Sequence, residues 1–295
     1  MAEIRNTIAE RPPNPPVSSL VSIDVGLRNF SLSRFTIPKP SQPPILLQWC
    51  KLNLPNYSGI PESPFNPQNY AQIVNKTLSD LVLLQSLRNP PPFPNVIVIE
   101  RQRFRTNGAR NVHESILKSN AIEYMLFASI ETFRNIIPGF NPVLVSSSPQ
   151  TMTAYWEDYY EANKSRYAVS DDTPNSKLIR MLVVDEWLRG ILGKDEGRSD
   201  TPFRISDKLT EGFRSLGPEA LENRLHRYRS VSRRIYECMS MLNEVNEDRF
   251  KVELDEEGTK KGDDVTDSLL HGLTYLKFEE NKGNLRAATE QLLAK

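Results

Sequence analysis

The chain has 295 residues, of which 38% are hydrophobic, so it is long enough to bury one large core or two small ones. Lys and Arg number 37 and so do Asp and Glu, so the zero net charge excludes a bulk attraction to nucleic acid, and any such contact must come from local clusters. No apolar run is long enough to span a membrane, and the two cysteines, Cys50 and Cys238, lack the spacing of a metal site.

The first 18 residues are rich in proline, and we expect them to form a flexible tail. They lack the Arg-rich, acid-free character of a transit peptide. Three strand patterns follow: residues 19–24 read as a buried strand, residues 30–36 alternate, and residues 45–50 form a third β-rich run. A glycine-containing turn and a proline-rich turn join them, which favours an antiparallel meander.

Helix and strand patterns alternate through the middle of the sequence. Helical spacing over residues 68–88 precedes Val96–Glu100, a β-branched run that is apolar up to its last residue, as expected for a strand covered on both faces. A long helical pattern over residues 112–136 leads to a fifth strand at residues 142–146. Ser148, followed by a proline, then predicts the start of another helix.

Residues 161–259 show weaker patterns, with helices predicted at 176–192 and 218–246. A last helix is predicted over residues 263–281. The order of the elements predicts an α/β fold in which helices flank a mixed five-stranded sheet. We therefore expect a tail at residues 1–18, one domain at 19–282 with a helical insertion at 161–259, and a second tail at 283–295.

Two of the predicted strands end in a carboxylate, Asp24 on the first and Glu100 on the fourth. A buried carboxylate is costly unless it is paired or binds a metal. Taken singly, Asp24 is explained as a turn-forming residue and Glu100 as the partner of a nearby arginine. Both explanations together are the weaker interpretation, so a shared functional site is favoured.

Further acids stand at the start of the last helix, in the sequence KKGDDVTDSLLHGL at residues 260–273. At about 100° per residue, Asp267 lies about 40° from Asp263 and about 60° from Asp264, so either can share its face. One of the two is explained as a helix cap. Capping does not explain Asp267, which stands a turn inside the helix beside an apolar stripe. His271 either lines this site or is simply packed.

Carboxylates from two strand ends and one helix form a hard, oxygen-only donor set. Such donors suit Mg²⁺, with Mn²⁺ as a substitute, and paired ions of this kind act in phosphoryl displacement. Zinc is disfavoured because the three histidines lack ligand spacing. The predicted ligands and catalytic residues are Asp24, Glu100, Asp267 and one of Asp263 and Asp264.

The residues after Glu100 read RQRFRTNGARN and combine four arginines with an aromatic ring and amides. Arginine binds phosphate bidentately and an exposed phenylalanine can stack on bases or wedge between them, so we favour nucleic-acid contact over a solvated loop. A second basic run at residues 224–234, on a predicted helix, is equally well explained as a solvated face. The predicted nucleic-acid-binding residues are Arg28, Arg101, Gln102, Arg103, Phe104, Arg105, Arg110, Lys118, Lys260 and Lys261.

Three segments resemble the fungal mitochondrial Holliday-junction resolvases, which are relatives of the RuvC-type resolvases within the RNase H-like superfamily. They are SIDVGLRNFSLS (22–33), VIVIERQRFRTN (96–107) and KKGDDVTDSLLHGLTYL (260–276). The resemblance runs from about residue 19 to residue 282 and is weakest over residues 161–259.

The resemblance implies a mitochondrial, Mg²⁺-dependent homodimer that cuts two opposed strands of a four-way DNA junction and leaves 5′-phosphate ends. It implies that Asp24, Glu100 and Asp267 are metal ligands, with the fourth ligand at Asp263 or Asp264.

The same resemblance assigns roles to two further segments. It implies that the helix at residues 112–136 forms the dimer interface. It also places the loop at residues 101–111 at the exchange point of the junction, with Phe104 as a wedge.

Three other functions stay open. Actin-like and sugar-kinase ATPases also open with Ile-Asp-Val-Gly, but they need Ser or Thr after the glycine and a second Gly-rich loop, whereas Leu27 and Arg28 follow here. A nuclease of the same superfamily that cuts RNA/DNA hybrids would share the acids, and the 101–111 loop argues against it. A non-catalytic junction-binding protein is disfavoured by the complete set of acids.

Overall fold

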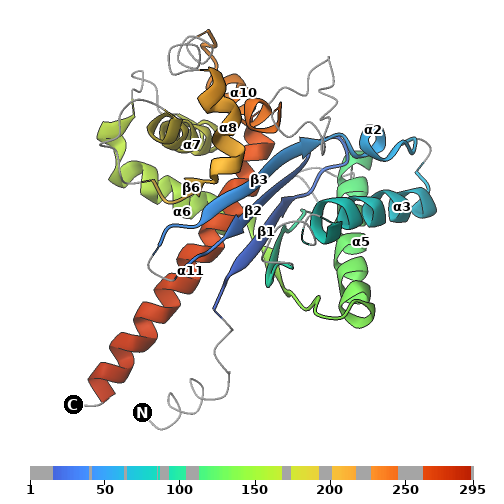
Figure 1. The fold of residues 1–295 in the computed structure, drawn as a ribbon, viewed down its shortest axis with the longest axis horizontal. Helices are drawn as coiled ribbons and strands as arrows, with labels where there is room; N and C mark the ends of the chain where they lie inside the picture. The colour runs from blue at the N-terminus through green and yellow to red at the C-terminus, as the bar shows by residue number, and fades with distance from the viewer. Residues whose placement is uncertain are drawn as a thin grey trace.

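A central sheet with helices on both faces forms the body of the protein (Figure 1). The computed structural model describes residues 16–39, 42–62, 65–84, 86, 93–103, 113–167, 174–192, 201–216, 227–244 and 262–293.

The sheet has the strand order β5-β4-β1-β2-β3-β6. The first three strands form the predicted antiparallel meander, β4 adds parallel to β1, and β5 adds parallel to β4. This mixed arrangement is that of the RNase H-like fold expected from the sequence. The strands are β1 (Ser19–Asp24), β2 (Phe30–Thr36), β3 (Ile45–Leu52), β4 (Val96–Glu100), β5 (Val143–Ser147) and β6 (Arg204–Ile205).

The prediction of five strands was wrong by one. The sixth strand, β6, comes from the insertion and pairs in parallel with the start of β3, where Ile45 lies opposite Arg204 and Leu46 lies opposite Ile205. A strand of two residues shows no alternation of apolar and polar positions, so the sequence pattern does not reveal it.

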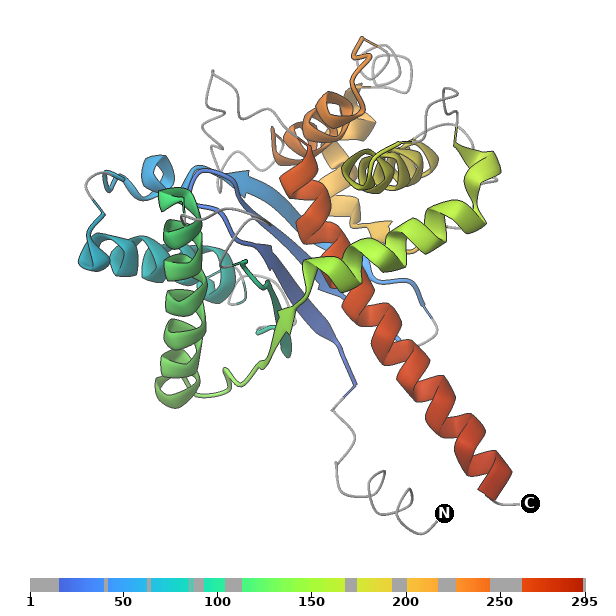
Figure 2. The same ribbon diagram turned by 180° about the vertical axis from the view of Figure 1, so that it is seen from behind.

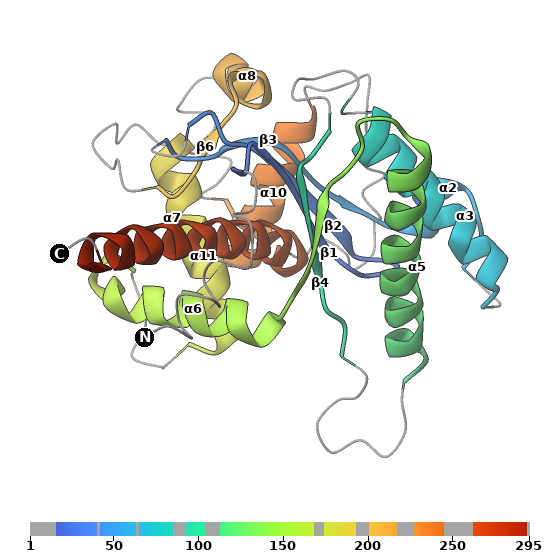
Figure 3. The same ribbon diagram turned by 90° about the horizontal axis from the view of Figure 1, so that it is seen from below.

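The helices divide into two layers, one on each face of the sheet (Figures 1 and 3). One layer contains α2 (Leu54–Ser58), α3 (Pro67–Leu78), the π-helical turn η1 (Ser79–Leu84) and α5 (Glu114–Ile136). The other contains α6 (Pro149–Ala162), the short 3-10 turn η2 (Lys164–Arg166), α7 (Ser176–Leu192), α8 (Asp207–Leu216), α10 (Val231–Glu244) and α11 (Asp263–Leu293).

Each layer encloses its own hydrophobic core, because successive side chains of a strand point to opposite faces. On β1, Leu20 belongs to the core under α11, whereas Val21 and Ile23 belong to the core under α3 and α5. All four apolar residues of β4 are buried, which confirms that this strand is covered on both faces.

Several predicted helices are confirmed, with corrections at their ends. Ser148 caps α6 as predicted, and α7 has the predicted bounds. The helix predicted at 218–246 is helical from Val231 among its described residues, because Ser230 accepts a hydrogen bond from the backbone N–H of Arg233 and ends the loop there.

The last helix is longer than predicted. It continues to Leu293 rather than ending at residue 281, so residues 283–293 are helical and extend beyond the sheet (Figure 2). Most side chains of this segment, such as Leu285, are exposed. The segment therefore has no buried apolar stripe at helical spacing that would predict a helix. Within the part of the chain that the structure describes, no helix has both the length and the apolar character needed to cross a membrane.

The insertion is built into the second layer. The helices α7 and α10 pack against each other and against α11, and α8 packs against α10 and β3. Trp187 on α7 and Phe203 just before β6 are buried in the same core as the strands.

The first part of α11 lies unusually close to the sheet. A Cβ atom at Gly272 would come within 3.0 Å of the Phe35 ring and 3.1 Å of Ser22 Cβ. Ser268 meets Ser31 at 2.7 Å between hydroxyl oxygens, and Ser33 donates to the Ser268 carbonyl at 2.9 Å. Small residues on both sides therefore let the helix backbone approach β1 and β2.

This close approach predicts an asymmetry between two glycines of α11. Gly272→Ala should destabilise the protein by about 1–3 kcal/mol, because the added methyl group overpacks a rigid contact. Gly283→Ala, whose Cβ meets no atom within 4 Å, should stabilise it by up to about 1 kcal/mol through helix propensity. Urea unfolding of the two variants measures both effects, and equal shifts would show that the docking of α11 is not tight.

Candidate active site at the ends of β1 and β4

The two strand-end carboxylates lie at the same edge of the sheet. Ile23 on β1 pairs with Ile99 on β4 in a parallel register, so the next residues, Asp24 and Glu100, leave the sheet side by side. Asp24 is 9% exposed and Glu100 is partly buried. This register brings the two strand-end acids to the same edge of the sheet.

The two carboxyl groups shift each other's pKa in opposite directions. Burial raises the pKa of Asp24 well above its usual value, and the charges of Glu100, Asp267 and Asp264 raise it further. Burial also acts to raise the pKa of Glu100, but the hydrogen bond from Asp24 and the nearby ring of His271 outweigh it and lower that pKa to about 2. Asp24 therefore holds a proton more readily than Glu100 does, and burial together with like-charge crowding dominates the electrostatics of this edge.

The third group of acids begins α11, directly after Gly262. The Gly262 N–H donates to Ser232 on α10 at 2.8 Å, and a Cβ at this position would collide with the Ser232 carbonyl oxygen. The start of α11 is thereby fixed against α10. This anchor sets where the following aspartates point.

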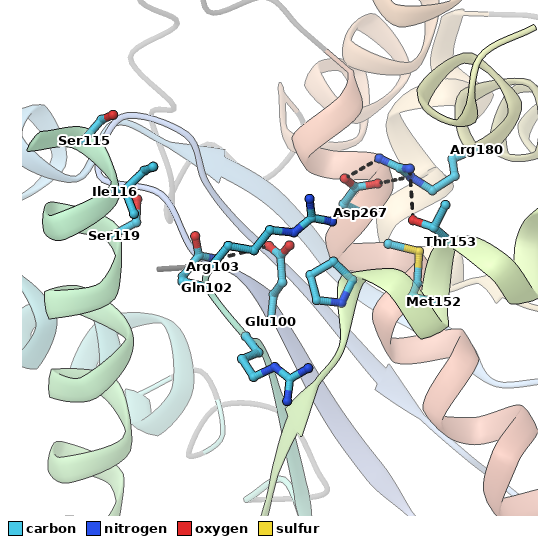
Figure 4. Close-up of a pocket in the computed structure, with 12 residues that line it drawn as sticks. Glu100, Gln102, Arg103, Ser115, Ile116, Ser119, Met152, Thr153, Arg180 and Asp267 are labelled. Carbon is cyan, nitrogen blue, oxygen red and sulfur yellow. Dashed lines mark hydrogen bonds and ion pairs between the residues drawn. The ribbon is translucent and has the colours of Figure 1, made fainter. Parts of the chain in front are cut away.

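Each aspartate of α11 meets a different basic side chain. Asp263 pairs with Lys177 of α7. Asp264 pairs with Lys51 of β3, with 2.6 Å between Oδ2 and Nζ. Asp267 is held on both oxygens by an arginine of α7, as Figure 4 shows.

The structure separates Asp263 from Asp264. The charges of Asp264 and Asp267 both raise the pKa of Asp24, whereas Asp263 is turned to Lys177 of α7. Burial raises the pKa of Asp264 and of Asp267 as well, and the paired Lys51 and Arg180 oppose that rise. Asp264 and Asp267 thus share the side of α11 that faces the strand-end acids.

His271 is both packed and adjacent to the acids. It is fully buried, its Nδ1 lies 2.7 Å from the Ser147 hydroxyl oxygen on β5, and its Nε2 lies 3.9 Å from Glu100 Oε1. The ring therefore fills the space between the end of β5 and Glu100, and its contact with Ser147 fixes how the ring is turned.

A cavity of about 530 Å³ opens beside Glu100 and Asp267. In Figure 4, Glu100 and Arg103 approach it from one side, and Asp267 and Arg180 from the other. Its lining also includes Arg101, Gln102, Ser115, Ile116, Ser119, Pro149, Met152 and Thr153. The cavity lies between the first turns of α5 and the start of α6, and it carries three arginines next to the acids.

The start of the predicted DNA-binding loop is fastened to α5. The buried Glu123 accepts a hydrogen bond from the Gln102 N–H at 2.9 Å, and the buried Asn120 donates to the Arg103 carbonyl at 3.1 Å. The Gln102 side chain donates to Glu100 at 3.3 Å. Arg101 and Arg103 themselves have exposed side chains at the cavity.

Two other predicted DNA-binding residues are held by an acid. Arg28, at the turn after β1, pairs with Glu62 at 2.7 Å, and Lys118 on α5 pairs with Glu62 at 3.0 Å and with Glu114 at 2.9 Å. The remaining predicted contacts, Phe104, Arg105, Arg110, Lys260 and Lys261, lie outside the described residues.

The basic partners of the acids were not predicted from the sequence. Lys51 interrupts the buried strand β3, and a lysine in such a strand is a signal in itself, because lysine is almost never fully buried without a partner. Arg180 stands four residues before Val184 and seven before Trp187, two apolar positions of the same helix face, so its place on the inner side of α7 was also readable. Lys177 of the same helix has a half-exposed side chain, and nothing in the sequence pattern predicted its contact with Asp263.

The acids suit a hard cation by chemistry, but their side chains do not converge on one point. Among the described residues, no three His, Cys, Asp or Glu side chains are grouped closely enough to hold a metal ion. Asp264 and Asp267 are turned to Lys51 and Arg180 instead. The donor set consists of carboxylates alone, and the raised pKa of Asp24 reports a crowding that a bound cation would relieve.

Comparison with known proteins finds one matching family and two similar proteins of the same name. Residues 20–285 match the family described as mitochondrial resolvase Ydc2 / RNA splicing MRS1. The chain is 27% identical over 271 residues to the mitochondrial cruciform cutting endonuclease 1 of Saccharomyces cerevisiae, covering 89% of this chain and 69% of the relative. It is 31% identical over 147 residues to the Schizosaccharomyces pombe protein of the same name, covering 48% of this chain and 54% of the relative.

One solved structure matches along nearly the whole chain. It is the crystal structure of the yeast mitochondrial Holliday junction resolvase Ydc2, with a TM-score of 0.54 and 20% identity, covering 99% of this chain and 92% of the other. At this identity the match establishes the fold.

The crowding of the acids predicts that removing one charge stabilises the metal-free protein. Because the pKa of Asp24 is raised on folding, its ionised form is unfavourable in the folded state at pH values above that pKa. Asp24→Asn should therefore raise the free energy of unfolding at neutral pH by an amount on the order of 1 kcal/mol. The gain should shrink as the pH falls from the raised pKa toward the ordinary pKa of an aspartate, below which Asp24 is protonated in the folded and the unfolded state alike.

Urea unfolding in the presence of a chelator, repeated between pH 8 and pH 5, measures this trend. Asp80→Asn on η1 serves as the control. The Asp80 carboxylate lies outside the site and pairs with Lys76 at 2.8 Å, so this substitution should not raise the free energy of unfolding. A destabilised Asp24→Asn would show that the carboxylate is structural.

Proposed function

The chain belongs to the mitochondrial resolvase Ydc2 / RNA splicing MRS1 family, and from this premise we propose that it is a DNA endonuclease that resolves four-way junctions in mitochondria. The observation that carries the proposal is the set of carboxylates at one edge of the sheet, Asp24, Glu100, Asp264 and Asp267, beside a cavity lined by arginines. Names of the two similar proteins, cruciform cutting endonuclease 1, describe the same class of reaction.

We propose that these four carboxylates hold Mg²⁺, for which Mn²⁺ would substitute. When bound, such ions lower the pKa of water and neutralise the charge that develops on the phosphate. Asp263 has a different role in this proposal. Its pairing with Lys177 at the first turn of α11 leaves it as a helix-start residue favoured by the dipole.

The side chains around the acids would position the DNA. Arg101 and Arg103 are exposed at the cavity and bear the planar fork that binds phosphate oxygens in pairs. Gln102, which donates to Glu100, and His271, which lies behind it, would restrict how the Glu100 carboxylate turns. In the proposed cut, water attacks the phosphorus of a phosphodiester in this cavity and the 3′ oxygen leaves, so one end keeps a 5′-phosphate and the other a 3′-hydroxyl.

RNA splicing is the second candidate, because the family description also names it. A protein that only binds RNA has no need for buried carboxylates that repel one another. In such a protein the crowding around Asp24 would lower the stability of the fold and serve no function. The site therefore favours cleavage. Cleavage of a four-way junction, compared with duplex DNA, single-stranded RNA and an RNA/DNA hybrid, decides between the substrates.

A homodimer through α5 completes the proposal. The inner face of this helix buries Ile122, Leu126 and Ile130 against the sheet. Its outer face exposes Leu117 at 57% and Tyr124 at 53%, seven residues apart and so on one side of the helix. Exposed apolar residues at this spacing suit a second copy of the same helix, since two opposed strands need two sites.

The assignment of the fourth ligand can be tested by a pair of neighbouring substitutions. Asp264→Asn should reduce Mg²⁺-dependent junction cleavage about a hundredfold or more, since even residues that only support metal ligands cost 10–100-fold. Asp263→Asn should stay within about threefold of the wild type, because it removes one partly exposed ion pair. Junction binding, measured by gel shift with a chelator present, should survive in both.

The reverse order of effects would make Asp263 the ligand. Loss of junction binding in parallel with loss of cleavage would instead show that these acids are structural.

The dimer can be tested at Tyr124. Tyr124→Arg places a charge in the proposed apolar contact and should raise the dissociation constant of the dimer about thirtyfold or more, the effect of losing a central interface residue. Sedimentation equilibrium measures it. Leu285→Arg, at a 70% exposed leucine of α11, is the matched control and should leave the mass of the dimer unchanged. If Leu285→Arg is monomeric and Tyr124→Arg is dimeric, the interface lies on α11 instead.

A further inference from the structure

The insertion delivers an arginine to the acids of the proposed active site. Arg180 of α7 donates from Nε to Asp267 Oδ1 at 2.8 Å and from Nη2 to Oδ2 at 3.0 Å, while Nη1 donates to Thr153 at 3.1 Å. Figure 4 shows this fork closing on the Asp267 carboxylate at the wall of the cavity. Both partners are largely buried, with side-chain exposures of 14% and 19%.

A bidentate pair of this kind leaves Asp267 fully engaged. Each carboxylate oxygen accepts one hydrogen bond from the guanidinium, and Thr153 holds the guanidinium in the orientation that makes both bonds. A divalent cation that binds Asp267 would need at least one of these oxygens. Because it would also stand close to the charge of Arg180 in a partly buried site, the two cations compete for the same carboxylate.

We propose that Arg180 is a resident counter-ion. Its guanidinium holds the Asp267 carboxylate before a metal ion binds and releases it when the metal ion takes its place. This inference rests on the proposed function of the site. Released from Asp267, the guanidinium remains in the cavity, which Arg101 and Arg103 also line. There it would bind a phosphate of the DNA strand that enters, so that metal binding and phosphate binding are coupled through one side chain.

The exchange explains two features that otherwise stand apart. The acids of the site do not converge as a metal shell in the described residues, because Asp267 is held by Arg180 and Asp264 by Lys51. The insertion at residues 161–259, to which the sequence analysis assigned no role, is the segment that carries Arg180. Its packing against α11 therefore places a functional side chain as well as completing a core.

The exchange predicts opposite effects on metal binding and on catalysis. Arg180→Gln removes the competing charge while keeping much of the side chain, so in the absence of DNA it should bind Mn²⁺ about tenfold more tightly than the wild type, within the usual range of coupling between ligands. At saturating Mn²⁺ the same variant should cut a four-way junction more slowly, because the phosphate contact is lost. A residue that only supports the fold would weaken both.

Isothermal titration of the DNA-free protein with Mn²⁺ is the deciding measurement. Arg189→Gln is the matched control, because Arg189 lies on the same helix and also pairs with an aspartate, Asp185, at 3.1 Å, but it is not part of the cavity lining. Its Mn²⁺ affinity should equal that of the wild type. Arg180→Lys, which keeps the charge without the planar fork, should fall between the wild type and Arg180→Gln.

A double-substitution cycle assigns the effect to Asp267. In an Asp267→Asn background, Arg180→Gln should no longer change the affinity for Mn²⁺. An unchanged or weaker Mn²⁺ affinity of Arg180→Gln in the wild-type background would overturn the exchange even if the protein cuts junctions. If the wild type cuts no junction, the proposed function fails, whereas a tighter Mn²⁺ affinity of Arg180→Gln would still establish the competition at Asp267.

Discussion

The close approach of α11 to the sheet is the constraint on which the site depends. Gly272, Ser268 and the serines of β1 and β2 bring the helix backbone to a distance that larger side chains would prevent. Trp49 strengthens this docking by donating from its indole to the Val265 carbonyl at 2.9 Å. Since Asp264 and Asp267 flank that carbonyl along the helix, the same contacts that bury α11 bring its acids to the ends of β1 and β4.

The crowded acids are held in place by basic residues drawn from separate parts of the fold. Lys51 comes from a buried strand, Lys177 and Arg180 come from the insertion, and His271 comes from α11 itself. Lys51 and Arg180 oppose the rise in pKa that burial causes at Asp264 and Asp267. Perturbed carboxylates that are compensated but not neutralised are typical of sites where stability is sacrificed for chemistry.

Much of the fold and half of the site could be predicted from the sequence. Asp24 and Glu100 were predictable because a charge at the end of an apolar strand is expensive, and parallel strands end at one edge. The choice between Asp263 and Asp264 could not be made, since both lie within about 60° of Asp267 on an ideal helix. It took the contacts of Lys177 and Lys51 to separate them.

The remaining elements of the site were hidden for other physical reasons. Arg180 meets Asp267 across 87 positions of sequence, and no local pattern encodes such a contact. The two-residue strand β6 is too short to show a period, and α11 continues beyond the sheet through Gly283 without an apolar face that would reveal it.

Helix α5 connects the loop after Glu100 with the proposed dimer contact. Its inner side holds the backbone of Gln102 and Arg103 through Glu123 and Asn120, while its outer side exposes Leu117 and Tyr124. In a dimer built on that outer side, a single rigid rod in each subunit would link the symmetry axis to the residues that follow Glu100. The two α5 helices would then fix the distance between the two cutting sites, so the protein could recognise the geometry of its substrate without reading its bases.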